Sequence, residues 1–391
     1  MSNDEFALSI SISNDLSEVN RESWNKIANL ENEVYDPFLD WDFLQALEQA
    51  GCATPETGWA PHHILVRDEG EQLVGACPMY LKSHSQGEFV FDHSWADAYE
   101  RAGGRYYPKL LIGVPFTPVT GRRLLTQTDN SSLIEDAIVQ TAVKMTSDNN
   151  LSSLHINFVD ALDYESLGGH GFLQRTDQQF HWENDNYSSF NDFLDVLTSR
   201  KRKNLRKERA QAQDGIRYEH LMGDEITSEH WDLFYNFYLD TGARKWGSPY
   251  LNRNFFELLG QRMSDKVLLV FAHDQRDDRA IAGALNMIGS DTLYGRYWGC
   301  NEQRPCLHFE TCYYQAIDYA IANGLKRVEA GAQGGHKLAR GYAPNPTYSA
   351  HFITNESFSD AIAQYLTHER EQVEADIEYL GQRTPFRKGN D

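Results

Sequence analysis

The sequence predicts an α+β protein made of two similar domains, the products of one duplicated domain. Two pairs of matching stretches carry this prediction. Residues 36–49 (DPFLDWDFLQALEQ) resemble residues 248–261 (SPYLNRNFFELLGQ), and residues 73–79 (LVGACPM) resemble residues 281–287 (IAGALNM). The two offsets are 212 and 208 residues, so the order and spacing of the matches are kept. A period this long exceeds that of solenoid repeats, and 391 residues are enough for two domains.

The first half is expected to combine helices with an antiparallel meander. From the periodicity of apolar residues we expect helices at 20–33, 40–50 and 131–147, and strands at 62–66, 73–82, 88–91, 110–114, 153–159 and 179–182. The second half repeats this order. There we expect helices at 190–213, 228–241, 253–263, 309–323 and 358–380, and strands at 266–273, 280–288, 292–298, 326–330 and 347–353.

Each half therefore reads as a mixed, mostly antiparallel sheet flanked by helices, and not as alternating βαβ units. We expect the first domain to cover residues 1–185 and the second to cover 186–391, in a pseudo-twofold relation. Ligands usually bind in clefts, and a duplicated domain creates one between its copies.

Composition narrows the class of protein. The net charge of −21 argues against broad binding to DNA or to anionic membranes, although a local basic site is compatible with it. No run approaches the roughly 18 apolar residues of a membrane span, and the acidic N-terminus lacks the apolar core of a signal peptide. Five scattered cysteines do not form a disulfide framework. We expect a cytoplasmic protein.

Several strings resemble the FemAB-like proteins of the GNAT superfamily, in the branch of predicted N-acyltransferases linked to peptidoglycan biosynthesis or recognition. They are FDHSWADAY at 91–99, YYPK at 106–109, VPFTPV at 114–119, QFHW at 179–182, SRKRK at 199–203 and EAGAQGGHK at 329–337. The resemblance extends over about residues 30 to 387. It implies tandem GNAT-like domains and transfer of an acyl or aminoacyl group to an amine, from acyl-coenzyme A or aminoacyl-tRNA.

One departure from ordinary GNAT enzymes bears on the donor. Their pyrophosphate loop is rich in glycine and opens a helix, where backbone N–H groups hold the phosphates. The equivalent turn here, 299–309, has a single glycine, and Glu302 and Glu310 would repel phosphate. The coenzyme A interpretation is weakened, and aminoacyl-tRNA or another activated donor is favoured.

The polar stretch 92–109 is the first candidate site, because so many bulky polar side chains rarely gather in a plain connector. A base must take a proton from the attacking amine, and we expect Asp92 or His93 to be that base. We expect substrate contacts from Trp95, Asp97, Tyr99, Arg105, Tyr107 and Lys109. The alternative is a loop held by its own hydrogen bonds.

The second half offers two further groups of candidates. Arg296, Tyr297 and Trp298 end a predicted strand, where an arginine can grip a carboxylate or phosphate and Trp298 would match Trp95. His336, Lys337 and Arg340 follow a glycine-rich turn that allows close backbone approach to an anion. The alternative for the first group is a cross-strand aromatic ladder. The alternative for the second group is a turn that carries surface charges.

A basic run at 200–209 stands out in this acidic chain. Arg200, Lys201, Arg202, Lys203 and Arg206 are candidates for phosphate or tRNA contacts, and a solvated helix face is the alternative. The spacing of Cys300, Cys306, His308 and Cys312 lacks the close cysteine pairs of zinc sites, so no metal is expected.

The sequence thus predicts an N-acyltransferase or aminoacyltransferase acting on a small-molecule or peptide amine. Two other interpretations stay open. One is a catalytically degenerate module that binds a cell-wall or peptide ligand, and the other is a tRNA-binding protein without transfer activity. The donor, the acceptor and the oligomeric state are not determined by the sequence.

Overall fold

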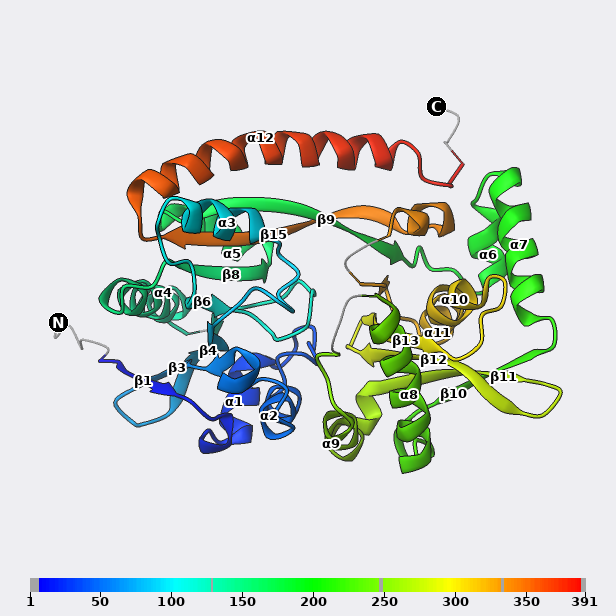
Figure 1. Cartoon of the computed structure of the whole chain (residues 1–391). Coiled ribbons are helices and arrows are strands. Elements are labelled where there is room, and N and C mark those ends of the chain that lie inside the picture. The colour runs from blue at the N-terminus through cyan, green and yellow to red at the C-terminus, as the bar shows by residue number, and fades with distance from the viewer. Residues whose placement is uncertain (1–6, 128, 246–248, 332–333, 388–391) are drawn as a thin grey trace. The chain divides into compact units, whose positions relative to one another are not determined.

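The computed structural model describes residues 7–127, 129–245, 249–331 and 334–387, without the side chains of 241–245 (Figure 1). The chain forms two compact units. The first contains Met1–Asp177 and Pro346–Glu374, and the second contains Gln178–Asn345 and Ala375–Asp391. The first break lies near the expected domain boundary after residue 185, which stays a prediction. The sequence did not indicate that part of the C-terminal segment belongs to the first unit.

The first unit holds two sheets, whose strand orders are β1-β3-β4-β7 and β15-β8-β6-β5-β2. In the second of these, β6 and β8 run parallel. The elements of this unit are β1 (Ser9–Ser13), α1 (Arg21–Ala28), α2 (Trp41–Gln49), β2 (Trp59–Pro61), β3 (His63–Arg67), β4 (Leu73–Cys77), β5 (Met79–Lys82), α3 (His93–Arg101), β6 (Lys109–Ile112), β7 (Leu125–Thr126), α4 (Ser131–Asp148), β8 (Ser153–Val159) and α5 (Ala161–Gly169).

The second unit has one sheet of order β10-β11-β12-β13-β14-β9, in which β13 and β14 run parallel. Its elements are α6 (Phe190–Asp195), α7 (Ser199–Gln213), β10 (Ile216–Leu221), α8 (Ser228–Lys245), α9 (Arg253–Met263), β11 (Val267–Asp274), β12 (Arg279–Ile288), β13 (Thr292–Cys300), α10 (Leu307–Phe309), α11 (Gln315–Ala322) and β14 (Arg327–Glu329). Three elements have residues in both units, namely β9 (Leu173–Glu183), β15 (Ala343–Ile353) and α12 (Glu356–Gly381).

The two matching sequence stretches fold into matching elements. Residues 36–49 form α2 and residues 249–261 begin α9, while the second pair lies on β4 and β12. Asp40 and Asn252 occupy the same place in the match, and each side chain caps its helix by accepting a backbone N–H bond, from Asp42 and Phe255 respectively. The α+β class and the mixed sheets predicted from the sequence are confirmed.

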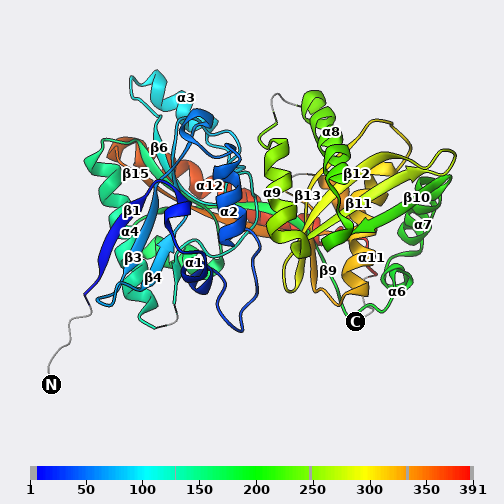
Figure 2. The ribbon, with the colours of Figure 1, turned by 90° about the horizontal axis from the view of Figure 1, so that it is seen from below.

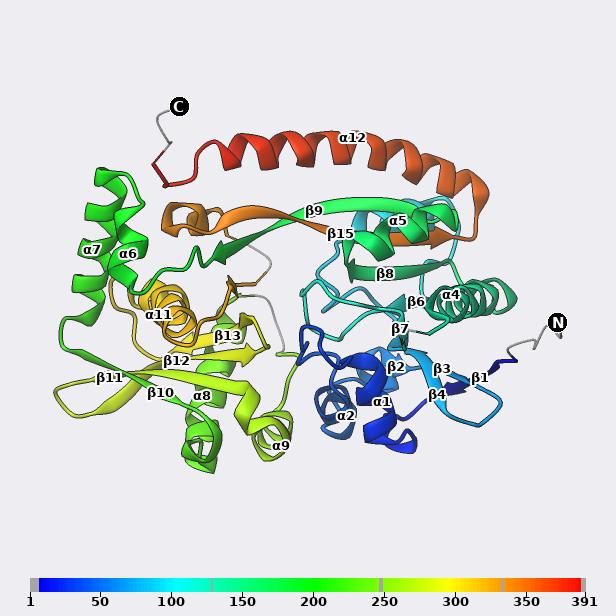
Figure 3. The same ribbon diagram turned by 180° about the vertical axis from the view of Figure 1, so that it is seen from behind.

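Each unit has its own apolar core against its own strands. In the first unit, α4 covers β3 and β4 from the side opposite α1 and α2, and Ile134 and Ile138 of α4 are fully buried there (Figure 3). In the second unit, α8 and α9 lie on one face of β11 to β13 and α11 lies on the other (Figure 2). Ile317 of α11 is buried there together with Leu268 and Ala284 of the sheet.

Three expectations about local structure were wrong. Residues 88–91 form no strand, and the polar stretch after them contains helix α3. The helix expected at 190–213 is broken, because Val196 and Thr198 make backbone hydrogen bonds to Arg387 and Pro385 instead of continuing the helix. Trp95 lies on helix α3 and Trp298 on strand β13, so these two residues do not occupy matching positions.

Within the described residues, no helix combines the length and apolar character that crossing a bilayer requires.

Candidate functional site

A pocket opens in the second unit where two parallel strands stop running together. β13 pairs with β14 only from Thr292 to Tyr294, because β14 ends at Glu329 while β13 continues to Cys300. The cavity measures about 90 Å³. It is lined by Ala284, Leu285, Asn286, Gly295, Arg296, Tyr297, Trp298, His308, Cys312, Tyr313 and Ala330. We call it the strand-end pocket.

A bulge in β13 places three predicted site residues along this pocket. Leu285 pairs with Tyr297 and Asn286 pairs with Gly295, so Arg296 is the extra residue on the bulged strand. Bulges of this kind redirect side chains and are common next to active sites. Arg296, Tyr297 and Trp298 all line the cavity, and each is partly exposed. Their role as substrate contacts stays a prediction.

The opposite wall of the strand-end pocket comes from an irregular helix. Helix α10 continues into a π-turn at Glu310–Tyr314 before α11 begins, and such turns are frequent at functional sites. The turn carries Cys312 and Tyr313 into the lining. The ring of His308 lies 4.5 Å from that of Trp298 and 5.3 Å from that of Tyr313. A half-buried imidazole thus lies between aromatic rings at the cavity.

The glycine-rich turn brings His336, Lys337 and Arg340 close to the same wall. Exposed His336 shares a 2.9 Å hydrogen bond with the Tyr313 hydroxyl. Lys337 is buried and donates from Nζ to the Gly331 carbonyl at 2.6 Å, and burial lowers its pKa to about 8. The guanidinium of Arg340 stacks 3.3 Å from the Phe309 ring. These residues pack around the pocket wall, and Ala332 and Gln333 of the same turn lie outside the described residues.

Helix α7, which carries the basic run, is anchored to the π-turn. Arg209 grips the fully buried carboxylate of Glu310 at 2.8 Å, and Glu208 accepts hydrogen bonds from Tyr314 and Arg340 at 2.6 and 2.9 Å. Arg202 pairs with Asp195 at 3.0 Å. In the described part of the chain, Arg200, Lys201, Lys203, Arg206 and Lys207 form no ion pair.

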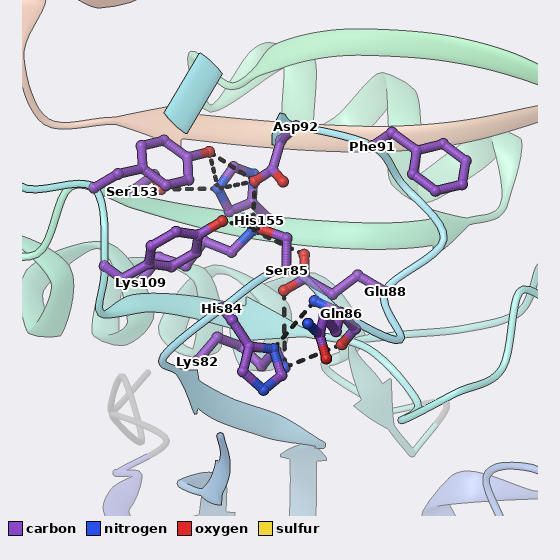
Figure 4. Close-up of polar contacts among 12 residues, drawn as sticks. Lys82, His84, Ser85, Gln86, Glu88, Phe91, Asp92, Lys109, Ser153 and His155 are labelled. Carbon is purple, nitrogen blue, oxygen red and sulfur yellow. Dashed lines mark hydrogen bonds and ion pairs between the residues drawn. The ribbon is translucent and has the colours of Figure 1, made fainter. Parts of the chain in front are cut away.

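The first unit holds a buried ionic cluster at the start of β6. The ammonium of Lys109, at the start of β6, donates to Glu88 and to Ser85 at 2.8 Å each and also to Asp92 (Figure 4). Tyr106 donates to Asp92 at 2.7 Å. Lys82 lies 3.9 Å from Glu88 and stacks 3.5 Å above the Trp59 ring. We call Lys82, Glu88, Asp92 and Lys109 the buried ionic cluster.

Burial and neighbouring charges shift the pKa values in this cluster. Burial raises the pKa of Asp92, but Lys109 and His155 outweigh burial and hold it far below its usual range. Burial raises the pKa of Glu88 against the opposing charge of Lys109. Burial also lowers the pKa of Lys82, to about 7. Asp92 therefore stays anionic near neutral pH, which suits a residue that holds Lys109 in place better than one that accepts a proton.

The structure separates several of the residues predicted from the stretch 92–109. Tyr107 and Lys109 each form a 2.8 Å hydrogen bond with the Ser85 hydroxyl, and Lys109 also donates to Asp92. Trp95 is buried next to His351. His93 and Asp97 are exposed on α3, away from these contacts. Arg105 is exposed, and Tyr99 packs on Phe358 with ring centroids 4.8 Å apart.

Sequence reasoning misses other buried titratable residues of the first unit. The strand predicted at 88–91 gives Glu88 no role at a site, and the strand predicted at 153–159 gives none to His155. In the structure, Nδ1 of His155 and Nδ1 of His351 lie 2.6 Å apart, which joins β8 to β15. Burial lowers the pKa of His155 to about 3. The available sequence signal for His155 is a titratable residue inside a predicted strand.

Comparison with known proteins supports one family. A family model described as FemAB-like, peptidoglycan biosynthesis/recognition, matches residues 15–388. FemX resembles the chain with a TM-score of 0.56 at 13% identity, over 88% of this chain and 98% of FemX. The C-terminal domain of a putative lysylphosphatidylglycerol synthetase from Agrobacterium fabrum reaches 0.55 at 8% identity, over 90% and 97%.

L-PGS from Bacillus licheniformis gives a TM-score of 0.51 at 8% identity, over 85% of this chain and 98% of that one. At these identities the likeness shows the fold, and the predicted tandem GNAT-like fold is confirmed. No curated protein sequence matches the chain.

Proposed function

This chain belongs to the FemAB-like family of peptidoglycan biosynthesis and recognition proteins, and we propose that it transfers an aminoacyl group from tRNA to the amine of a peptide. The family supports a peptidoglycan-related acyl- or aminoacyltransferase. The donor, the acceptor and the residues that act on them are part of the proposal. The strand-end pocket is the observation that carries it.

The pocket suits an activated carbonyl that an amine attacks. The amine nitrogen would bond to the carbonyl carbon, the bond from that carbon to the ester oxygen of the donor would break, and a base would move the proton from the amine to the leaving oxygen. His308 is the titratable side chain best placed for this, since its half-buried ring lines the cavity beside Trp298 and Tyr313. The aromatic walls position the reactants.

Two features favour aminoacyl-tRNA over coenzyme A as the donor. The turn after β13 leads into α10, a helix of three residues, and Arg304 in that turn is already paired with Glu302 at 2.8 Å and with Asp274. Helix α7, in contrast, offers Arg200, Lys203 and Lys207 on one face. Its anchor at Arg209 is six residues from Lys203, about 9 Å along a helix, so a bound RNA end would lie near the pocket wall.

A transfer assay with matched histidine variants tests the proposal. The full chain would be incubated with tRNA charged with a labelled amino acid, and separately with labelled acetyl-coenzyme A, together with a lysine-containing peptide. We expect label to move from tRNA to the peptide. His308→Gln should reduce the rate by about 10²–10⁴-fold, the range for loss of a general base. His93→Gln, at an exposed histidine that does not line the pocket, should keep the rate.

The other outcomes separate the alternatives. If His93→Gln removes activity and His308→Gln keeps it, the reaction centre lies at α3. Transfer from acetyl-coenzyme A alone would contradict the tRNA donor. Binding of charged tRNA without any transfer would favour the tRNA-binding protein, and binding of the peptide alone would favour the degenerate binding module.

A further inference from the structure

A second pocket lies in the first unit, at the junction of three segments. It measures about 470 Å³, within the range typical of small-molecule sites. Helix α3 with the loop that follows it, the end of α4 with the turn after it, and the segment between β15 and α12 form its walls. Its lining consists of Tyr99, Arg105, Ser147, Asn150, Leu151, Ser152, Thr354 and Asn355. We call it the Arg105 pocket.

Arg105 is the charged residue of this lining, and most of its guanidinium is available. Its Nε donates to the Tyr107 carbonyl at 2.9 Å, which fixes the base of the side chain. Within the described part of the chain, its two terminal nitrogens make no hydrogen bond or ion pair. A guanidinium held in this way presents two parallel donors, the geometry that a carboxylate fills in a bidentate contact.

Two further lining residues offer donors to the same pocket. The Tyr99 ring is held by Phe358 and by Gly104, where an added Cβ would lie 2.4 Å from a ring carbon. Its hydroxyl makes no hydrogen bond to any described residue. Asn355 accepts the Phe358 N–H through Oδ1 at 2.9 Å, which leaves its amide nitrogen as a donor.

The carbonyl and carboxylate groups at the end of α4 should repel a bound anion only weakly. Its last carbonyls are already used, because Thr146 and Ser147 accept backbone N–H bonds from Leu151 and Asn150 at 3.0 and 3.1 Å. Asp148 pairs with Lys144 at 2.7 Å. The pocket thus combines one cation with several neutral donors, and an ionised carboxylate, which only accepts hydrogen bonds, complements that lining.

We propose that the Arg105 pocket binds an organic carboxylate, such as the C-terminal carboxylate of a peptide. Carboxylate binding in this pocket does not depend on the proposed transfer activity. Arg105 would contact both carboxylate oxygens, and the Tyr99 hydroxyl would donate to one of them.

Binding of one peptide in two chemical forms tests this inference. Glycylglycyllysine would be titrated against the full chain as the free acid and as the C-terminal amide, with ligand-observed NMR as the readout. We expect the acid to bind at least about tenfold more tightly, since a charge-assisted contact contributes roughly 1.5–3 kcal/mol. Arg105→Gln should abolish the difference, and Arg105→Lys should keep only part of it, because lysine cannot make the bidentate contact.

Arg101→Gln is the matched control. Arg101 is also exposed and also donates from Nε to a backbone carbonyl, that of Asp97 at 3.0 Å, but it does not line the pocket. This variant should retain the preference for the acid. Equal binding of acid and amide, no binding of either, or equal losses in the Arg101 and Arg105 variants would overturn the inference.

The result is independent of the transfer assay. Transfer without discrimination between acid and amide would refute carboxylate binding and leave the proposed function intact. Discrimination without transfer would support the carboxylate site and refute the transferase.

Discussion

Lys109 and Glu88 form an ion pair of 2.8 Å inside the first unit, with side chains that are 0% and 1% exposed. Taking two charges out of water is costly, and here the cost is offset by several contacts at once. The same ammonium also donates hydrogen bonds to Asp92 and Ser85. Such a pair contributes little more to the free energy of unfolding than apolar residues of the same size would. Removing one partner, however, leaves a buried charge without compensation.

Replacing Lys109 should therefore destabilise the protein strongly. Lys109→Met removes the charge that Glu88 and Asp92 share, and we expect the free energy of unfolding to fall by about 3–5 kcal/mol. Urea denaturation of the purified variant would measure this. Lys144→Met is the control, because Lys144 and Asp148 form an exposed pair on α4 whose contribution should be below about 1 kcal/mol. Similar losses in the two variants would contradict a structural role for the cluster.

The buried histidine pair predicts a loss of stability in acid. Burial lowers the pKa of His155 to about 3, from an ordinary value near 6.5. A base with a depressed pKa in the folded state takes up a proton first in the unfolded state, so its contribution to stability is complete above pH 6.5 and is lost as the pH falls towards 3. Within this window we expect a decrease of about 1.4 kcal/mol per pH unit from His155.

Urea denaturation at pH 7 and pH 5 would show this effect. His155→Asn should flatten the decrease between the two pH values. His170→Asn should not, because His170 is partly exposed and its pKa is raised by the Ser166 carbonyl and by Asp136. An unchanged slope in the His155 variant would assign the acid sensitivity to other groups.

The sequence contains enough local information to predict most of the elements. Helices α2, α4 and α9 and strands β8, β11 and β12 lie within a few residues of the expected ranges, because their apolar residues recur at helical or strand spacing. The match between residues 36–49 and 249–261 has a physical basis, since both stretches carry a helix cap and share several buried apolar positions. Phe43 and Phe255 are one such buried pair.

The candidate sites were less predictable, because they depend on contacts between distant segments. Arg296, Tyr297 and Trp298 adjoin one another in sequence and lie together at the pocket. In contrast, His351 reaches His155 across 196 residues, and no local pattern indicates that contact. Asp92 and His93 are neighbours in sequence, yet one is buried and the other exposed, because the chain enters a helix between them.

The basic face of α7 predicts a salt-dependent affinity for RNA. Neutralising Arg200, Lys203 and Lys207 together as glutamines should weaken tRNA binding and reduce the slope of log affinity against log salt concentration by about 2–3, since each lost phosphate contact removes about 0.7–0.9. Filter binding at salt concentrations from about 50 to about 200 mM would measure the affinity and its salt dependence. Arg202→Gln is the control, because Arg202 is paired with Asp195. An unchanged slope in the triple variant would exclude α7 from the RNA contact.

Both stretches of the second matching pair contain a glycine at the same position, Gly75 and Gly283, and close packing explains it. A Cβ at Gly75 would lie 2.2 Å from Cγ2 of Ile134, and one at the matching Gly283 would lie 3.0 Å from the Phe271 ring. Gly75→Ala should therefore force α4 away from β4 and lower the free energy of unfolding by about 1–3 kcal/mol, the usual cost of overpacking. Gly169→Ala is the control, because a Cβ at the end of α5 has no atom within 4 Å. Gly169→Ala should leave the free energy of unfolding unchanged or slightly raised. Urea denaturation would measure both variants. An equal loss in the two would show that glycine flexibility, and not close packing, explains the match.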